Sequence, residues 1–215
     1  MSLARQYDAT DIVFGPKLSL ACIGREALAV EAKAKRIARN LAVDLSVFDQ
    51  EACASPHNVF IEKGGQISPE EFASFLALKF EDVLKQIPKT IDNAGVQGAV
   101  KSARMKHYLD GEVFTSPGLE WSVLYRDKLQ WNQPVYGRTA LVRAVEDLKD
   151  IIPYISRENQ VIGLALPTPR RLELAEKFAQ AGVDRITTIG HMADFTSPWD
   201  GIFPIDKLIR WVSLS

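Results

Sequence analysis

The chain has 215 residues, of which 47% are hydrophobic, and its 26 Lys and Arg against 27 Asp and Glu give a formal net charge of −1. This composition excludes a disordered chain, whose hydrophobicity would be low and whose net charge would be high. The balanced charge also argues against a nucleic-acid partner, because nucleic-acid-binding proteins usually carry a clustered excess of Lys and Arg.

The first third of the chain alternates short apolar runs with a helical segment. The run Leu18–Ile23 lies between a Gly-Pro and a Gly-Arg pair, which is typical of a buried strand. Residues 25–43 are rich in Ala, Glu, Lys and Arg and repeat apolar side chains at helical spacing, so they predict one helix. A loop is expected from Asp49 to His57, followed by a short strand at 58–62.

The sharpest boundary is Ser68-Pro69-Glu70-Glu71, where Ser68 can cap free amide groups and Pro69 suits the first helical position. A helix is expected to begin there and to end before Pro88. The remaining predicted elements are a helix over about 92–109, strands at 123–125, 139–145 and 161–166, a helix over 169–181 ended by Gly182, and a strand at 185–189.

Strands that alternate with helices of 10 to 20 residues favour parallel strands joined by crossover helices. We therefore predict an α/β fold with three α/β/α layers around a mostly parallel sheet. The sequence contains no internal repeat, low-complexity tract or linker, so residues 1–215 are expected to form one domain.

The cellular setting follows from what the chain lacks. Two cysteines are too few for a disulfide framework or a cysteine metal cluster. The first residues do not resemble a secretion signal, and no run of about 18 apolar residues occurs. We expect a soluble, cytoplasmic protein without membrane insertion.

Cys53 is the main candidate for chemistry. It lies in the loop between a predicted helix and a predicted strand, and the small residues Ala52 and Ala54 flank it, so a substrate could approach the sulfur closely. A thiolate is a strong nucleophile that can accept an acyl group. The alternative is a buried, inert cysteine, and local composition alone leaves the two readings about equal.

The other cysteine and the three histidines are weaker candidates. Cys22 lies in an apolar strand and is expected to be structural. His57 could act as a base only if the loop folds back, His107 is expected to be solvated in a basic helix, and His191 follows a predicted strand. No metal site is expected, because neither His-x-x-x-His nor Cys-x-x-Cys spacing occurs. No glycine-rich phosphate-binding motif occurs either.

Five motifs occur together over nearly the whole chain. They are Phe14-Gly15-Pro16-Lys17, Asp49-Gln50-x-Ala52-Cys53-x-Ser55-Pro56, Pro134-Val135-Tyr136-Gly137-Arg138-Thr139, Trp199-Asp200-Gly201 and Ile209-Arg210-Trp211-Val212. The most specific of them are the cysteine loop and the Pro-Val-Tyr-Gly-Arg-Thr run. With these motifs the chain resembles the acyl-CoA reductase family, which includes the fatty acyl reductase of bacterial bioluminescence and belongs to the aldehyde dehydrogenase superfamily.

The resemblance implies roles for single residues. Cys53 falls on the nucleophilic cysteine that receives the fatty acyl group as a thioester. Tyr136 matches an aromatic residue beside the nicotinamide ribose, although Pro134 replaces the glutamate that binds the ribose. Lys17 matches the lysine that follows the superfamily's general-base glutamate, whereas Val13 and Phe14 lie near the place of that glutamate. The missing carboxylate suits a reductase, whose thioester must wait for hydride.

The resemblance also implies an N-terminal cofactor-binding domain that has no counterpart here. We therefore interpret residues 1–215 as the catalytic-cysteine domain, which is not expected to be fully active alone. The implied activity is NADPH-dependent reduction of a long-chain acyl thioester to a fatty aldehyde through a Cys53 acyl-enzyme. His57 and His191 are the candidates for proton transfer or oxyanion support.

The implied partners are long-chain acyl-CoA or an acyl-transferring synthetase or transferase subunit, and the superfamily's habit suggests a homo-oligomer. Two other functions stay open from the sequence. One is a non-catalytic acyl-binding or oligomerisation module in which Cys53 is merely buried. The other is an oxidative aldehyde dehydrogenase, against which the missing glutamate argues.

Overall fold

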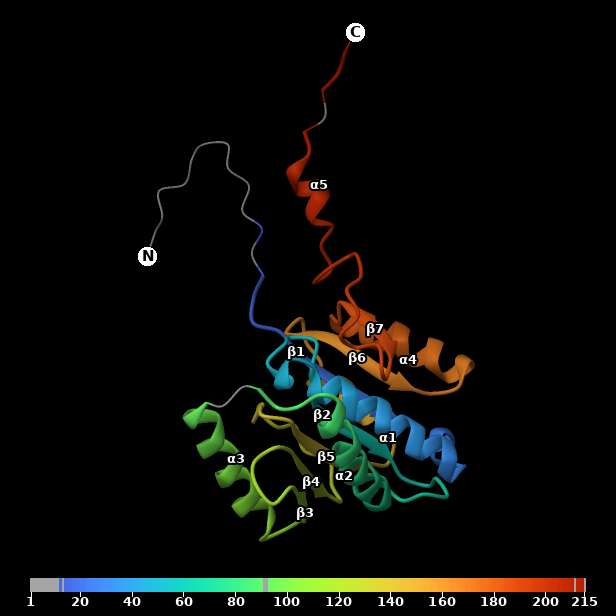
Figure 1. Cartoon of the computed structure of the whole chain (residues 1–215). Coiled ribbons are helices and arrows are strands. Elements are labelled where there is room, and N and C mark those ends of the chain that lie inside the picture. Colours follow the sequence, from blue (N-terminus) through green and yellow to red (C-terminus); the bar gives the residue numbers. More distant parts are fainter. Residues whose placement is uncertain (1–11, 13, 91–92, 211, 215) are drawn as a thin grey trace.

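The computed structural model describes residues 12, 14–90, 93–210 and 212–214. Its centre is a seven-stranded sheet flanked by helices (Figure 1). The strands are β1 (Leu18–Ile23), β2 (Pro56–Glu62), β3 (Glu112–Thr115), β4 (Ser122–Arg126), β5 (Thr139–Val145), β6 (Asn159–Ala165) and β7 (Arg185–Thr188). The helices are η1 (Arg25–Leu28), α1 (Glu31–Ser46), η2 (Val47–Gln50), α2 (Pro69–Gln86), α3 (Ala94–His107), η3 (Leu148–Tyr154), α4 (Thr168–Ala181) and α5 (Pro204–Leu208), with η marking 3-10 helices.

The strands follow the order β3-β4-β5-β2-β1-β6-β7 across the sheet. All neighbouring pairs are parallel except β3 and β4, which are antiparallel. The predicted mostly parallel α/β fold is therefore confirmed. Because β2 is central, all seven of its residues are buried, as expected for a strand covered on both faces.

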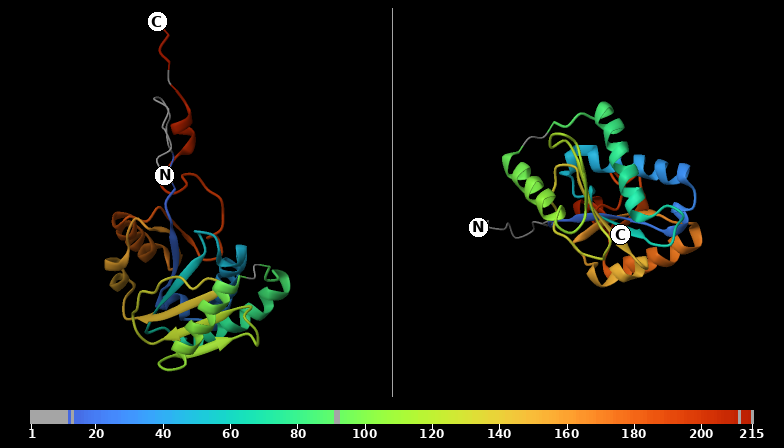
Figure 2. Two further views of the ribbon diagram at one scale, coloured as in Figure 1. Left: turned by 90° about the vertical axis from the view of Figure 1, so that its left-hand side faces the viewer. Right: turned by 90° about the horizontal axis from the view of Figure 1, so that it is seen from below.

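The two faces of the sheet carry different helices (Figure 2). α1 and α2 pack against one face, where Leu41 and Phe72 are fully buried beside Val142 of β5. α4 and η3 cover the opposite face through Phe178 and Ile151. α3 lies over the β4–β5 end of that second face. There its Arg104 donates a hydrogen bond from Nε to Ser122 Oγ at 3.0 Å.

Most predicted elements are confirmed within two residues at their ends. Thr139–Val145 is a strand as predicted, and the predicted helix of residues 169–181 ends at Gly182, whose φ of 114° is left-handed. The short strand β3 and the helices η3 and α5 were not predicted. Each has at most seven residues, too few to show a clear period.

The prediction of one helix over 25–43 is wrong at its start. A 3-10 turn, η1, comes first, and α1 begins only after Val30, whose backbone is extended. The carbonyl oxygen of Leu28 accepts a hydrogen bond from the amide of Ile67 at 3.0 Å. A tertiary contact from 39 residues away therefore takes the place of a helical hydrogen bond, which no local pattern could reveal.

The predicted cap at Ser68 is present, and it yields a first test. Ser68 Oγ accepts a hydrogen bond from the Glu71 amide at 3.1 Å. Ser68→Ala removes this acceptor and should lower the free energy of unfolding by about 1 kcal/mol, measured by denaturant titration. Ser74→Ala, inside the same helix, is the control and should cost less, since alanine is the better helix former. Equal losses for both variants would contradict a capping role.

Candidate functional site

The loop after α1 turns sharply toward the sheet. Phe48, Asp49 and Gln50 have φ values of 53°, 51° and 68°, three successive residues in the left-handed region. Such residues cost free energy and persist only where surrounding contacts hold them. Phe48 points outward and is 57% exposed, while Asp49 and Gln50 are buried. The two buried side chains are the contacts that hold the turn.

Asp49 forms a buried ion pair with Arg138. The Arg138 Nε–H donates to Asp49 Oδ1 at 2.7 Å, and both residues are at most 3% exposed. The same guanidinium donates to the carbonyl oxygens of Ile87 at 2.8 Å and Pro88 at 3.1 Å. Thr90 donates to the other carboxylate oxygen of Asp49. One ion pair thus joins the loop, the segment after α2 and the start of β5.

Gln50 forms a second anchor with backbone groups only. Its Nε2 donates to the carbonyl oxygens of Pro56 at 2.8 Å and Thr139 at 3.0 Å, and its Oε1 accepts from the Thr139 amide at 2.7 Å. The side chain therefore bridges the first residues of β2 and β5. Because both ends of the loop are fixed to the sheet, the residues between them have a defined place.

Cys53 lies between these anchors and is partly buried, whereas Ala54 and Ser55 are 4% exposed each. Its carbonyl oxygen accepts a hydrogen bond from Ser19 Oγ at 2.7 Å. The loop precedes β2, so it lies at the amino ends of the parallel strands (Figure 1). In open α/β sheets ligands usually bind at the carboxyl ends. The site is therefore at the less usual edge of the sheet.

Cys22 is the opposite case, as predicted. It lies inside β1 and is 0% exposed. Burial, and then the negative charge of Glu62, raise the pKa of this thiol well above its ordinary value. Both effects oppose formation of a thiolate, so Cys22 is a structural residue.

The structure brings His57 and Tyr136 together. His57 is the second residue of β2 and is 2% exposed, and its ring meets the Tyr136 ring edge-on with 4.8 Å between centroids. Its Nδ1 has no hydrogen-bond partner in the described part of the chain. Burial lowers the pKa of His57 to about 4, so the imidazole is neutral near pH 7.

The shape of the Tyr136 turn explains how this ring reaches His57. Tyr136, Gly137 and Arg138 have φ values of 65°, 63° and 59°. A Cβ on Gly137 would lie 2.8 Å from Val96 Cγ1, so only glycine fits there. The left-handed turn sends the Tyr136 ring toward His57 and the Arg138 side chain toward Asp49.

His191 lies on an exposed turn, and its Nδ1 is 2.9 Å from Asp194 Oδ2. The turn is tied to α1 by Asp44, whose carboxylate accepts from the amides of Gly190 at 2.5 Å and Met192 at 3.2 Å. Burial raises the pKa of Asp44 and the two hydrogen bonds lower it; burial has the larger effect, so the pKa rises to about 6. Met192 packs against Ala54, so the turn adjoins the Cys53 loop. His191 is near the site, with its own side chain toward solvent.

Arg185, the first residue of β7, is a neighbour of the site that sequence reasoning missed. Its guanidinium donates to the carbonyl oxygens of Met192 and, at 2.9 Å, Asp194. Burial lowers the pKa of Arg185, while the negative charges of Asp194, Asp44 and Cys53 act in the opposite direction. A cation therefore lies within electrostatic range of Cys53. The signal in the sequence is an arginine at the start of an otherwise uncharged strand.

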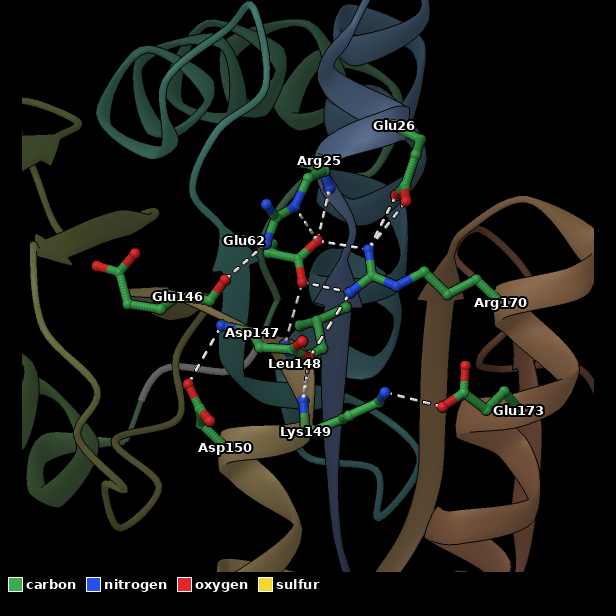
Figure 3. A network of polar contacts seen from close by, with 10 residues as sticks. All are labelled: Arg25, Glu26, Glu62, Glu146, Asp147, Leu148, Lys149, Asp150, Arg170 and Glu173. Carbon is green, nitrogen blue, oxygen red and sulfur yellow. Dashed lines mark hydrogen bonds and ion pairs between the residues drawn. The ribbon is translucent and has the colours of Figure 1, made fainter.

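A cluster of charged residues at the carboxyl edge was also missed (Figure 3). Glu62, the last residue of β2, is 0% exposed and accepts hydrogen bonds from Arg25 Nε at 3.0 Å and Arg170 Nη1 at 2.6 Å. Its carboxylate also accepts from the Leu148 amide. Burial raises the pKa of Glu62, but hydrogen bonds from Arg170 and Arg25 prevail and lower it to about 2. This fully partnered carboxylate fastens the segments after β1, β5 and β6 together.

The expectation of a solvated His107 is wrong. The ring is 5% exposed, its Nδ1 lies 2.8 Å from the Ala103 carbonyl oxygen, and its Nε2 lies 3.0 Å from Nη2 of the buried Arg143. Burial lowers the pKa of His107 to about 4. Val100 and His107 are the buried residues of α3, and the last turn of the helix reaches Arg143 on β5, a contact across 36 residues of chain. His107 is thus part of the packing of α3.

The remaining predicted residues are placed as follows. Lys17 Nζ forms an ion pair with Asp184 at 2.9 Å and also donates to the Arg157 carbonyl oxygen. Phe14 is exposed, and Val13 lies outside the described residues. Among the described residues, no group of three or more His, Cys, Asp or Glu is arranged to hold a metal ion. No described helix is long and apolar enough to cross a membrane.

The chain is similar to known proteins over nearly its whole length. The family described as acyl-CoA reductase (LuxC) matches residues 2–211. The long-chain acyl-protein thioester reductases of Vibrio harveyi and Aliivibrio fischeri are 26% and 27% identical to the chain over 204 and 203 residues. Each match covers 93% of this chain but 41% of the relative, so the chain spans less than half the length of these relatives.

The fold has solved counterparts as well. The crystal structure of an NAD-dependent aldehyde dehydrogenase from Burkholderia multivorans superposes with a TM-score of 0.64 at 16% sequence identity. The superposition covers 84% of this chain and 37% of that chain. The expected likeness to an aldehyde dehydrogenase domain is therefore confirmed at the level of the fold.

The Asp49–Arg138 pair can be tested by removing its cation. Arg138→Met should lower the free energy of unfolding by about 3–5 kcal/mol, because the buried carboxylate loses its compensating charge. Asp49→Asn in the same chain should recover part of that loss. Lys79→Met, which breaks the partly exposed ion pair with Asp82, is the control and should change stability little. Denaturant titration measures all four chains, and a loss at Arg138 no larger than at Lys79 would contradict the assignment.

The Glu62 cluster predicts a dependence of stability on pH. The pKa of Glu62 is lower in the folded chain than its ordinary value of 4.5. The ionised group therefore contributes its full stabilisation above about pH 4.5 and loses it as the pH falls toward 2. At pH 7 Glu62→Gln should cost about 3–5 kcal/mol, and the gap to the unaltered chain should narrow through that window. A gap independent of pH would show that Glu62 is not ionised.

Proposed function

Because the chain belongs to the acyl-CoA reductase (LuxC) family, we propose that it carries the acyl-accepting thiol of a long-chain acyl thioester reductase. The observation that supports this most is the state of Cys53, which is partly exposed in a loop whose two ends are fixed by buried side chains. A thiol that had only to fill space would need neither the strained turn nor its anchors.

The proposed first step is acyl transfer to Cys53. The thiolate attacks the carbonyl carbon of a long-chain acyl thioester, a bond forms between that carbon and Sγ, and the donor leaves as a thiolate. The acyl donor is a long-chain acyl-CoA or an acyl group on a partner protein; the relatives' names refer to acyl-protein thioesters. Arg185, held beside the Met192 turn, places a cation on the side of the loop where Met192 packs against Ala54.

The oxyanion of the tetrahedral intermediate needs hydrogen-bond donors at the Cys53 loop. Backbone amides of the fixed loop are the nearest candidates, and one such donor is worth about a hundredfold in rate or more. His57 is neutral near pH 7 because burial lowers its pKa to about 4. Its proposed role is therefore to donate a hydrogen bond from a neutral ring. His191, solvated and paired with Asp194, is the proposed route for proton exchange with water.

The proposed reductant is NADPH. When bound, NADPH would supply the hydride needed to reduce the acyl group on Cys53 to a fatty aldehyde, with Cys53 leaving as the thiolate. The described residues fit one end of such a cofactor: the half-buried Tyr136 ring, held against His57 by a left-handed turn, offers a face for the nicotinamide ribose. The chain has no Gly-x-Gly-x-x-Gly motif, so we propose that the rest of the cofactor binds elsewhere in the whole protein.

The setting of the reaction follows from the same proposal. A long-chain acyl donor carries an apolar chain, and the exposed Phe48 beside the anchored turn offers it an apolar contact. We place the protein in the cytoplasm as a homo-oligomer that does not insert into membranes.

The test is intact-mass spectrometry of the chain after incubation with palmitoyl-CoA and no cofactor. The unaltered chain should gain the mass of one palmitoyl group, and Cys53→Ala should gain none, because the nucleophilic sulfur is absent. Cys22→Ala is the matched control and should be acylated like the unaltered chain, since Cys22 is buried inside β1. Acylation that persists in Cys53→Ala would overturn the assignment.

A further inference from the structure

Ser19 has an unusual place in the sheet. It is the second residue of β1 and is 2% exposed. The register of β1 shifts at this point against both neighbouring strands: Ser19 pairs with Pro56 and Leu20 with Asn58 on one side, while Leu18 and Leu20 pair with Asn159 and Ile162 on the other. β2 and β6 thus each carry one extra residue opposite the start of β1, the arrangement of a β-bulge.

The Ser19 hydroxyl forms two hydrogen bonds at this bulge. Oγ accepts a hydrogen bond from the amide of Val161 on β6 at 3.1 Å and donates one to the carbonyl oxygen of Cys53 at 2.7 Å. A buried backbone amide and a carbonyl of the Cys53 loop are therefore joined through one side chain. Bulges are common beside active sites, where they redirect a side chain or end the pairing of two strands.

The second of these bonds acts on the peptide that follows the reactive residue. The hydrogen bond from Ser19 to the Cys53 carbonyl oxygen restrains the orientation of the Cys53–Ala54 peptide, which moves as one plane because the peptide bond does not rotate. Gln50 holds the loop on one side of Cys53, and the amide of Ser55 donates to the Ala52 carbonyl oxygen at 2.9 Å within it. The Ser19 bond acts on Cys53 itself and restrains the backbone that carries its side chain.

Val161 extends the same contact to the far side of the loop. Its side chain packs with Ala54 and Met192. Val161 also pairs with Arg185 across β6 and β7. The amide that donates to Ser19 therefore belongs to the residue against which Ala54 packs, so a shift at Ser19 would be transmitted to Ala54, the residue next to Cys53.

We propose that Ser19 is a positioning residue for Cys53, whose hydroxyl holds the thiol in the orientation that acyl transfer needs. The proposal rests on the proposed function of Cys53. Ser19 contacts Cys53 through the backbone carbonyl oxygen, so its effect should fall on the rate of acylation and not on the affinity for the donor. A merely structural residue would change stability without this division.

The test measures single-turnover acylation of the chain by palmitoyl-CoA over a range of concentrations. Ser19→Ala should lower the acylation rate at saturation by about 10- to 100-fold, the loss that a small misplacement of a reacting group produces. The half-saturating concentration should stay within about twofold of that of the unaltered chain. Ser19→Thr keeps the hydroxyl and should retain most of the rate. Ser19→Val has the same shape as Ser19→Thr but no hydroxyl and should not retain it.

Ser46→Ala is the matched control. Ser46 is 1% exposed at the end of α1, and its Oγ has no hydrogen-bond partner among the described residues. Removing this hydroxyl should leave acylation unchanged. If Ser19→Ala does not fold, the Ser19→Thr and Ser19→Val pair carries the comparison. Equal acylation rates in that pair, or an unaltered rate in Ser19→Ala, would overturn the proposal.

Alkylation of Cys53 by iodoacetamide separates this proposal from the proposed function. If palmitoyl-CoA does not acylate the unaltered chain, the proposed function fails, but the effect of Ser19 on the thiol can still be measured. Ser19→Ala should then change the alkylation rate and its pH dependence at temperatures far below unfolding, and Ser46→Ala should not. Identical pH profiles for Ser19→Ala and the unaltered chain would contradict a positioning role.

Discussion

The buried ion pair of Asp49 and Arg138 is the constraint on which the candidate site depends. Two charges taken out of water are tolerated only when each compensates the other and their remaining hydrogen bonds are satisfied. Arg138 meets this condition through the carbonyl oxygens of Ile87 and Pro88, and Asp49 through Thr90. The pair thereby fixes two left-handed turns at once, one before Cys53 and one that carries Tyr136. A thiol and an aromatic ring from segments 83 residues apart are held at one edge of the sheet.

The two edges of the sheet carry different groups: a structural charged cluster at the carboxyl edge and the Cys53 loop at the amino edge. At the carboxyl edge, where ligands usually bind in open α/β sheets, Glu62 accepts hydrogen bonds from two arginine side chains and two backbone amides and has a structural role. At the amino edge the strand ends are held by single side chains such as Gln50 and Ser19, which leaves Cys53 partly exposed between them. The carboxyl edge is thus fixed by a structural cluster, whereas the amino edge carries the Cys53 loop, which the Asp49–Arg138 pair, Gln50 and Ser19 hold in place.

The sequence predicts much of the fold because strands such as Thr139–Val145 and caps such as Ser68 depend on neighbouring residues. It also separates Cys53 from Cys22, since a loop of small residues differs from an apolar strand. It could not predict contacts between distant residues. Asp49 finds Arg138 across 89 residues, the last turn of α3 buries His107 against Arg143, and Ile67 interrupts the helix expected over 25–43. Each of these depends on how the strands are ordered across the sheet, which local patterns do not specify.

The central claim is that this frame makes Cys53 a reactive thiol while Cys22 on the adjoining strand stays inert. The most direct measurement is the rate at which iodoacetamide modifies each cysteine of the native chain as a function of pH, followed by peptide mass spectrometry. The account predicts that Cys53 reacts in the folded chain, at a rate that rises as the thiol ionises, and that Cys22 reacts only on unfolding. Equal protection of both cysteines until the chain unfolds would contradict the account, because Cys53 would then be a packing residue like Cys22.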